Sequence, residues 1–247
     1  MRTDLPVPGI ALAIAAHPDD VEFDCGATFA KWSEAGAVVH HLICTDGSKG
    51  SWDASADTTE LVSRRQDEQR EAARRLGSIG EVRFLGQTDG ELTHGLDLRG
   101  DVARIIRELR PDVVLGHDPW RRWRIHPDHR AAGWLAVEGV VAARDPHFFP
   151  EQGLPHHRPS SLLLFDTDGA DHAESVASRH VEAKIDALLA HESQFETTMY
   201  IDLDSPESDA AKSQVSEFRD RITAECREAG RTAGVPLAEA FHLIDDI

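Results

Sequence analysis

Apolar residues occur along the chain in short runs that do not alternate with polar ones. These runs cover residues 9–16 (GIALAIAA), 37–44 (AVVHHLIC), 82–85, 112–116 and 161–165. A continuous apolar run of this length is typical of a strand that is buried on both faces, as in a parallel sheet. We therefore predict five such strands, and an additional edge strand in the last segment, LAEAFHLIDDI.

Predicted helices fill the intervals between these runs, at residues 26–35, 58–76, 98–110, 127–143, 174–191 and 207–229. In the third of them, Val102, Ile105 and Leu109 recur at a helical spacing. Strands that alternate with helices form right-handed βαβ units. The predicted fold class is therefore α/β, a mostly parallel sheet with helices on both faces in three layers.

Composition supports one globular domain over residues 1–247. The chain is 40% hydrophobic and 28% charged, and no linker, repeat or low-complexity tract divides it. Its loop 146–160 is long, and we expect it to cover part of the active site.

The net charge is −18, so the chain is a poor candidate for nucleic-acid binding through a basic surface. No window reaches the roughly 18 apolar residues of a membrane span. Three cysteines, Cys25, Cys44 and Cys226, occur without a CxxC pair. This sparse count argues against a disulfide scaffold and predicts a cytoplasmic protein. The sequence leaves open whether the chain forms a homo-oligomer.

Polar clusters follow three of the predicted strands: HPDD after the first, TDGS after the second, and the stretch from GHDP to HPDH after the fourth. Ligands of a doubly wound sheet bind beyond the carboxyl ends of its strands, so we expect these clusters to converge.

The first cluster suits a metal ion. His17 and Asp20 are separated by two residues, and imidazole nitrogen and carboxylate oxygen are both zinc ligands. A helix N-cap by an aspartate is the alternative. The second His-Pro-Asp tripeptide adds His126 and His129, which share one face at a helix start. Three protein ligands plus water are typical of catalytic zinc, and this reasoning leaves open which histidine is the third ligand.

Taken together, AHPDDVEFDCGAT, the charged helix around Arg65–Glu68 that ends in LG, and HPDH before a helix resemble the PIG-L/LmbE family of zinc-dependent N-deacetylases. The resemblance runs from about residue 9 to about residue 195 and implies a Rossmann-like fold. It implies that the zinc ligands are His17, Asp20 and His129.

The resemblance also implies roles for the neighbouring side chains. Asp19 matches the general base, His126 the histidine that stabilises the oxyanion, and Asp128 a carboxylate that orients a ligand histidine. The expected activity is deacetylation of an N-acetyl amino sugar or related glycoconjugate, a small molecule, by a zinc-activated water. An amidase acting on a thiol conjugate or another N-acyl compound is the alternative. Asp and His ligands would also accept Fe²⁺, Co²⁺ or Mn²⁺.

Six further residues are candidate substrate contacts: Asp46, Arg65, His117, Arg124, Lys184 and His191. Arg65 matches an arginine of the family pattern R-x-x-E-x-x-x-A, and a solvated helix charge is the alternative. A turn role is the alternative for Asp46. Lys184 and His191 are expected two turns apart on one helix face, with a polar helix face as the alternative.

Two readings of another class remain. A nucleotide-binding Rossmann module would need G-x-G-x-x-G after the first strand, where HPDD stands instead. A metal-binding protein without catalysis would leave Asp19 without a role.

Overall fold

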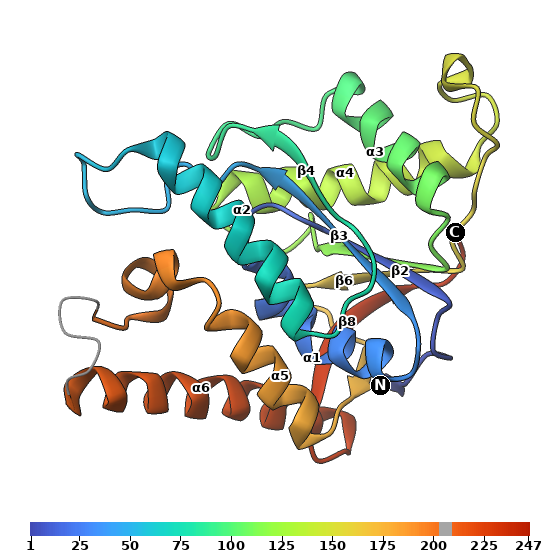
Figure 1. Ribbon diagram of the computed structural model, residues 1–247. Coiled ribbons are helices and arrows are strands. Elements are labelled where there is room, and N and C mark those ends of the chain that lie inside the picture. Colours follow the sequence, from blue (N-terminus) through green and yellow to red (C-terminus); the bar gives the residue numbers. More distant parts are fainter. Residues whose placement is uncertain (203–208) are drawn as a thin grey trace.

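The computed structural model describes residues 1–202 and 209–247. An eight-stranded sheet runs through its centre in the order β1-β7-β8-β6-β5-β2-β3-β4 (Figure 1). The strands are β1 (Arg2–Thr3), β2 (Ile10–Ala15), β3 (Val38–Thr45), β4 (Val82–Gln87), β5 (Val113–His117), β6 (Ser161–Phe165), β7 (His172–Ser175) and β8 (Ala238–Ile244). Strands β2 to β6 pair in parallel, as the unalternated apolar runs predict.

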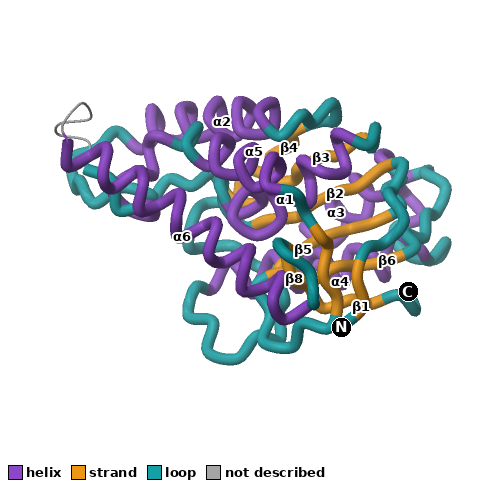
Figure 2. The backbone as a smooth tube through the Cα atoms, turned by 90° about the horizontal axis from the view of Figure 1, so that it is seen from below, coloured by secondary structure: helices purple, strands orange, loops and turns teal. Residues whose placement is uncertain are grey.

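Helices cover both faces of this sheet, which confirms the predicted fold class (Figures 1 and 2). They are α1 (Asp20–Glu34), α2 (Thr58–Arg75), α3 (Leu96–Leu109), α4 (Pro127–Arg144), α5 (Ser178–Leu188) and α6 (Asp209–Ala233). Helices α1, α2, α5 and α6 lie on one face and α3 and α4 on the other. Short helical turns follow at η1 (Pro150–Gln152), η2 (Glu192–Gln194) and η3 (Phe195–Met199).

The core has one apolar cluster on each face of the sheet. Phe29 and Trp32 of α1 pack in the first cluster, and Ile106 and Leu135 of α3 and α4 pack in the second. Strand β2 contributes to both, because its successive side chains point to opposite faces. In the described part of the chain, no helix is long and apolar enough to cross a membrane.

The sequence prediction is wrong for the carboxyl-terminal strand. β8 lies inside the sheet, antiparallel to both β6 and β7, rather than at an edge. The predicted helix 174–191 is also wrong at both ends, because residues 172–175 form β7 and α5 ends at Leu188. His172 and Glu174 hide the strand from a hydrophobic pattern, since both are polar and yet buried.

Helix α1 begins at Asp20, six residues before the predicted start at Gly26. It is broken at Cys25, whose φ of −142° and ψ of 18° are not helical. The second part therefore has its own free amide groups at Ala27 and Thr28, and the Glu239 carboxylate accepts both, at 3.1 and 2.7 Å. The sequence pattern detected this second part only.

Loop 146–160 lies far from the site it was expected to cover. It joins the end of α4 to the start of β6, and Arg107 of α3 donates hydrogen bonds to its Phe148 and Phe149 carbonyls. A helix-to-strand connection lies at the amino ends of parallel strands, whereas ligands bind at the carboxyl ends.

Candidate metal centre and active site

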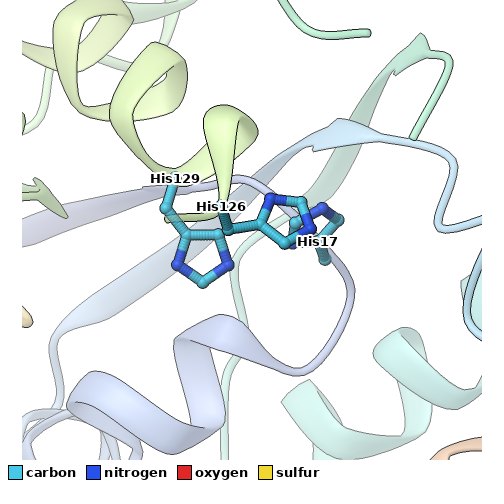
Figure 3. Close-up of side chains that lie close together, drawn as sticks. All are labelled: His17, His126 and His129. Atoms are coloured by element: carbon cyan, nitrogen blue, oxygen red, sulfur yellow. The ribbon is translucent and has the colours of Figure 1, made fainter. Parts of the chain in front are cut away.

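Three histidines converge where β2 and β5 end and α4 begins. Figure 3 shows the rings of His17, His126 and His129 turned towards one another. The centroid of the His17 ring lies 4.6 Å from that of the His126 ring and 5.1 Å from that of the His129 ring. One nitrogen from each ring lies within 4.8 Å of the others, close enough to bind one metal ion. The predicted convergence of the HPDD and HPDH loops is thus confirmed.

Asp20 joins the same cluster. Its Oδ2 lies 3.4 Å from His17 Nδ1, and its Oδ1 lies 3.4 Å from His129 Nε2. Asp20, His117 and His129 form a second, overlapping group of potential ligands. The nitrogen and carboxylate donors fit a zinc ion.

Asp128 holds His17 from the other side of the ring. Its fully buried carboxylate lies 3.2 Å from His17 Nε2 and accepts the amide groups of Gly90 and Leu92. A carboxylate at one ring nitrogen leaves the other for a metal. The nitrogen left for a metal is Nδ1, which lies beside Asp20. The contact between Asp128 and His17 Nε2 is the one that the predicted role of Asp128 requires.

The charges of the cluster are those of a cation site. Burial opposes protonation of His17, but hydrogen bonds to Asp128 and Asp20 raise its pKa well above its ordinary value. Burial lowers the pKa of His129 to about 2, although Asp20 opposes this effect. Buried carboxylates that draw a proton onto His17 would be compensated by a bound cation, and His129, which burial keeps neutral, is in the protonation state that a metal ligand needs.

Asp19 lies beside the cluster in a strained backbone conformation. Its φ is 99°, in the left-handed region, and its side chain makes no capping hydrogen bond although it stands at the N-cap of α1. Its amide donates to Gln69 Oε1 at 3.0 Å. Its carboxylate lies 3.5 Å from the guanidinium of Arg65. Burial raises the pKa of Asp19 to about 6, and Arg65 opposes the rise.

A cavity of about 610 Å³ opens over these groups. Its inner lining includes His17, Asp19, Asp20, His126 and His129. Such a volume is ordinary for a small-molecule site.

A match to a known family completes this description. Residues 12–140, more than half of the chain, match the family model described as PIG-L: GlcNAc-PI de-N-acetylase. The chain belongs to the PIG-L family.

Two relatives and two solved structures resemble this PIG-L chain. Diacetylchitobiose deacetylase of Thermococcus kodakarensis is 35% identical over 74% of this chain and 69% of its own length. The 1D-myo-inositol 2-acetamido-2-deoxy-alpha-D-glucopyranoside deacetylase of Streptomyces avermitilis is 34% identical, over 62% of this chain and 59% of its own length. The structure of N,N'-diacetylchitobiose deacetylase from Pyrococcus horikoshii has a TM-score of 0.83 at 30% identity, covering 96% of this chain and 84% of that one.

The same fold also carries other chemistry. A 4-carboxy-2-hydroxymuconate hydratase from Pseudomonas putida has a TM-score of 0.74 over 95% of each chain at 19% identity, and this likeness shows the fold alone. Function must therefore be argued from the site.

Of the six predicted substrate contacts, the structure places only Arg65 and Arg124 in the cavity lining. Arg65 donates to the carbonyls of Pro18 and Gly47, at 2.7 and 3.0 Å, so it also fixes the turn that carries Asp19. Arg124 contacts His129 Nδ1 and lies 3.0 Å from Asp166. The alternative of a solvated charge is wrong for Arg65, which is buried.

The other four predicted contacts lie outside that lining. Asp46 accepts the amides of Ser48 and Asp89, which is a turn role. His117 is buried behind Asp20, with its Nε2 3.2 Å from Asp20 Oδ2. Each has a partner that explains its burial or its position.

Lys184 and His191 do not share a helix face, because α5 ends before His191. Lys184 is buried and donates to Glu239 at 2.6 Å. His191 is buried 3.4 Å from Glu22. The prediction that these two side chains reach into the cleft is therefore wrong, because both make buried contacts within the protein.

Sequence reasoning missed several residues that line or support the cavity. Asp89 follows β4, so the rule that placed the other clusters at strand ends also applies to it. Gln69 is one helical turn from Arg65, and this spacing was the available signal. No sequence motif pointed to Arg221 of α6, which also lines the cavity.

Proposed function

We propose that this chain is a zinc-dependent deacetylase of N-acetyl amino sugars, with diacetylchitobiose as the first substrate to test. The observation that carries the proposal is the position of Asp19. It is a buried carboxylate that lines the cavity directly beside the His/Asp cluster. Membership of the PIG-L family and the similarity to a diacetylchitobiose deacetylase support the choice of substrate.

His17, Asp20 and His129 would hold the metal. Zinc, when bound, lowers the pKa of water and polarises an amide carbonyl. Asp20 is preferred over His126 as the third ligand because its two oxygens lie beside both His17 and His129. Fe²⁺, Co²⁺ and Mn²⁺ are alternatives for the same donors.

Asp19 acts as the general base and accepts a proton from the attacking water. A pKa of about 6 leaves it mostly ionised at neutral pH, and still basic enough to take the proton. Arg65 and Gln69 hold its carboxylate and its backbone, respectively. Once protonated, Asp19 can donate this proton to the leaving amine.

His126 donates a hydrogen bond to the developing oxyanion. Its Nδ1 accepts the amide of Asp128 at 3.3 Å, so the neutral ring carries its proton on Nε2. Burial and the neighbouring His17 lower the pKa of His126, which favours this neutral form. The donor is therefore the neutral imidazole of His126.

The cysteines fit a reducing compartment. All three cysteines are free and buried, and we place the protein in the cytoplasm on that ground.

The test measures amine release by the zinc-loaded protein from diacetylchitobiose, N-acetylglucosamine and an N-acyl thiol conjugate. Asp19→Asn should lower kcat by about 10²- to 10⁴-fold while zinc remains bound at the same stoichiometry. Asp67→Asn, an exposed change on α2, is the matched control and should behave as the unmodified protein. Turnover by Asp19→Asn at the original rate would contradict the assignment, and release from the thiol conjugate alone would favour the amidase alternative.

A further inference from the structure

A buried polar network lies behind Asp19 and outside the cavity lining. It consists of Glu22 of α1, His41 of β3, Gln69 of α2 and His191, which precedes η2. Each of these four residues is at most 1% exposed. Helix α5 lies beside both α1 and α2, so packed elements enclose the network (Figure 1). Apart from Gln69, its members have no role in the chemistry proposed above.

The backbone of Asp19 needs support from outside its own turn. Its φ of 99° is a value that residues other than glycine rarely adopt, and such conformations persist only where neighbouring groups hold them. The Asp19 amide donates to Gln69 Oε1 at 3.0 Å, which ties the strained turn to α2. The orientation of the Gln69 amide therefore helps to fix where the Asp19 carboxylate points.

Glu22 dictates that orientation. The two ends of a glutamine amide are similar in shape, but one accepts hydrogen bonds and the other donates them. Gln69 Nε2 donates to Glu22 Oε1 at 2.8 Å, and His41 Nδ1 lies 3.4 Å from the same nitrogen. With its nitrogen facing these groups, Gln69 presents its oxygen to the Asp19 amide. A reversed Gln69 amide would place two donors against each other at Asp19 and two oxygens against each other at Glu22.

His191 faces the other oxygen of Glu22. Its Nε2 lies 3.4 Å from Glu22 Oε2. Within residues 1–202 and 209–247, this oxygen and both ring nitrogens of His191 are buried without a hydrogen-bond partner. Because buried polar atoms are rarely left unpaired, we expect these neighbouring groups to pair with each other. An imidazole N–H at Glu22 Oε2 would keep the carboxylate from turning away from Gln69.

The turn that carries His191 is anchored independently. The Ser193 amide and hydroxyl donate to the Glu68 carboxylate of α2 at 2.9 and 2.6 Å. Gln194 Nε2 donates to the Gly50 carbonyl at 3.1 Å. His191 is thus held at a fixed place beside α2, from which its ring can restrain a side chain of α1.

We propose that Glu22 and His191 are positioning residues for the deacetylation and act on the general base Asp19 through Gln69. His191 restrains Glu22, Glu22 orients the Gln69 amide, and this amide holds the strained backbone of Asp19. This inference rests on the proposed function, in which Asp19 takes the proton from water. A misplacement of about 1 Å at a reacting group can lower a rate on the order of 100-fold, so small movements in the network should reach the chemistry.

The first experiment measures kcat, KM and zinc content with diacetylchitobiose. Glu22→Leu and Gln69→Leu should each lower kcat by about 10- to 100-fold, with KM and zinc stoichiometry retained. The double variant should be slower than the slower single one by no more than about threefold, because both changes break the same path. His191→Leu should lower kcat about tenfold, whereas His191→Gln, which keeps a donor for Glu22, should stay within about threefold of the unmodified protein.

Two further variants separate positioning from folding. His172→Leu is the matched control, because His172 is also buried and its Nε2 lies 2.9 Å from the buried Glu174, in β7 and outside the cavity lining. It should lower stability as His191→Leu does and leave kcat unchanged. Glu22→Gln keeps the size of the side chain and should fold even if Glu22→Leu does not. Because its amide can also turn the wrong end towards Gln69, kcat should fall about three- to tenfold.

The second experiment needs no turnover. Hydrogen exchange at the Asp19 amide, followed by NMR in the zinc-loaded and isotope-labelled protein, reports whether Gln69 holds this group. Relative to the amides of β2, exchange at Asp19 should be at least about tenfold faster in His191→Leu and in Glu22→Gln. His172→Leu should leave this ratio unchanged.

Three results would each overturn the positioning role: an unchanged kcat in His191→Leu and Glu22→Gln, losses that add fully in the double variant, or an Asp19 amide that exchanges at its original rate. Failure of the unmodified protein to release amine from any substrate named above would instead refute the proposed function. The exchange rates would still decide whether the network holds Asp19, so the two failures can be told apart.

Discussion

Replacing Lys184 by methionine should destabilise the folded protein without changing any of the proposed metal ligands. The Lys184 ammonium is buried, donates to Glu239 at 2.6 Å and to the Phe23 carbonyl at 2.6 Å. The Glu239 carboxylate in turn accepts the amides of Ala27 and Thr28. Lys184→Met leaves this buried carboxylate without a counter-charge.

Removing one partner of a buried ion pair costs about 3–5 kcal/mol, a large part of the roughly 5–15 kcal/mol that stabilises a typical protein. Thermal or urea unfolding measures this loss directly, and Tm should fall by roughly 10 °C. Lys184→Met with Glu239→Gln should recover part of the loss, because the buried charge disappears, while the single Gln oxygen can accept from only one of the two helix amides.

Lys212→Met, an exposed lysine on α6, is the control and should change the free energy of unfolding by less than about 0.5 kcal/mol. A loss below about 1 kcal/mol for Lys184→Met, or a double variant less stable than the single one, would refute the reasoning.

Three further predictions concern the site and its surroundings. Gln69→Leu leaves the Asp19 amide unpaired, so kcat should fall about 10- to 100-fold with KM and zinc content retained, and an unchanged kcat in steady-state assays would exclude a positioning role. Asp20→Ala should lose zinc on dialysis while His126→Ala keeps it, as measured by elemental analysis; the reverse pattern would make His126 the ligand. Burial lowers the pKa of His41 to about 4, below the 6.5 of the unfolded chain. The neutral ring therefore adds about 3 kcal/mol to the free energy of unfolding above pH 6.5, and this contribution is lost as the pH falls from 6.5 to 4. His41→Asn should flatten that part of the curve of unfolding free energy against pH, and an unaltered slope would assign it to other groups.

Local signals predicted the five buried parallel strands and the convergence of the histidines and aspartates at their ends. The unalternated run before His17 marks a strand buried on both faces, and the tight His-Pro-Asp turn at its end fixes where the polar groups stand. The same logic placed His126 and His129, because topology alone brings the carboxyl ends of neighbouring strands together.

Long-range pairings were beyond the reach of that reasoning. Glu239 caps a helix break more than 200 residues earlier in the chain, and no local pattern encodes such a partner. For the same reason the sequence wrongly predicts that Lys184 lies in the cleft. The position of β8 within the sheet depends on where the chain returns after α6, and the residues of β8 do not specify this.

The break in α1 at Cys25 separates two duties that a continuous helix would combine. The first turn carries Asp20 beside the histidines, and the second part packs Phe29 and Trp32 in the core. In a continuous helix, a displacement of Phe29 or Trp32 would be transmitted along the axis to Asp20. Because α1 is broken at Cys25, we expect substitutions in this part of the core to displace Asp20 less than they would in an unbroken helix.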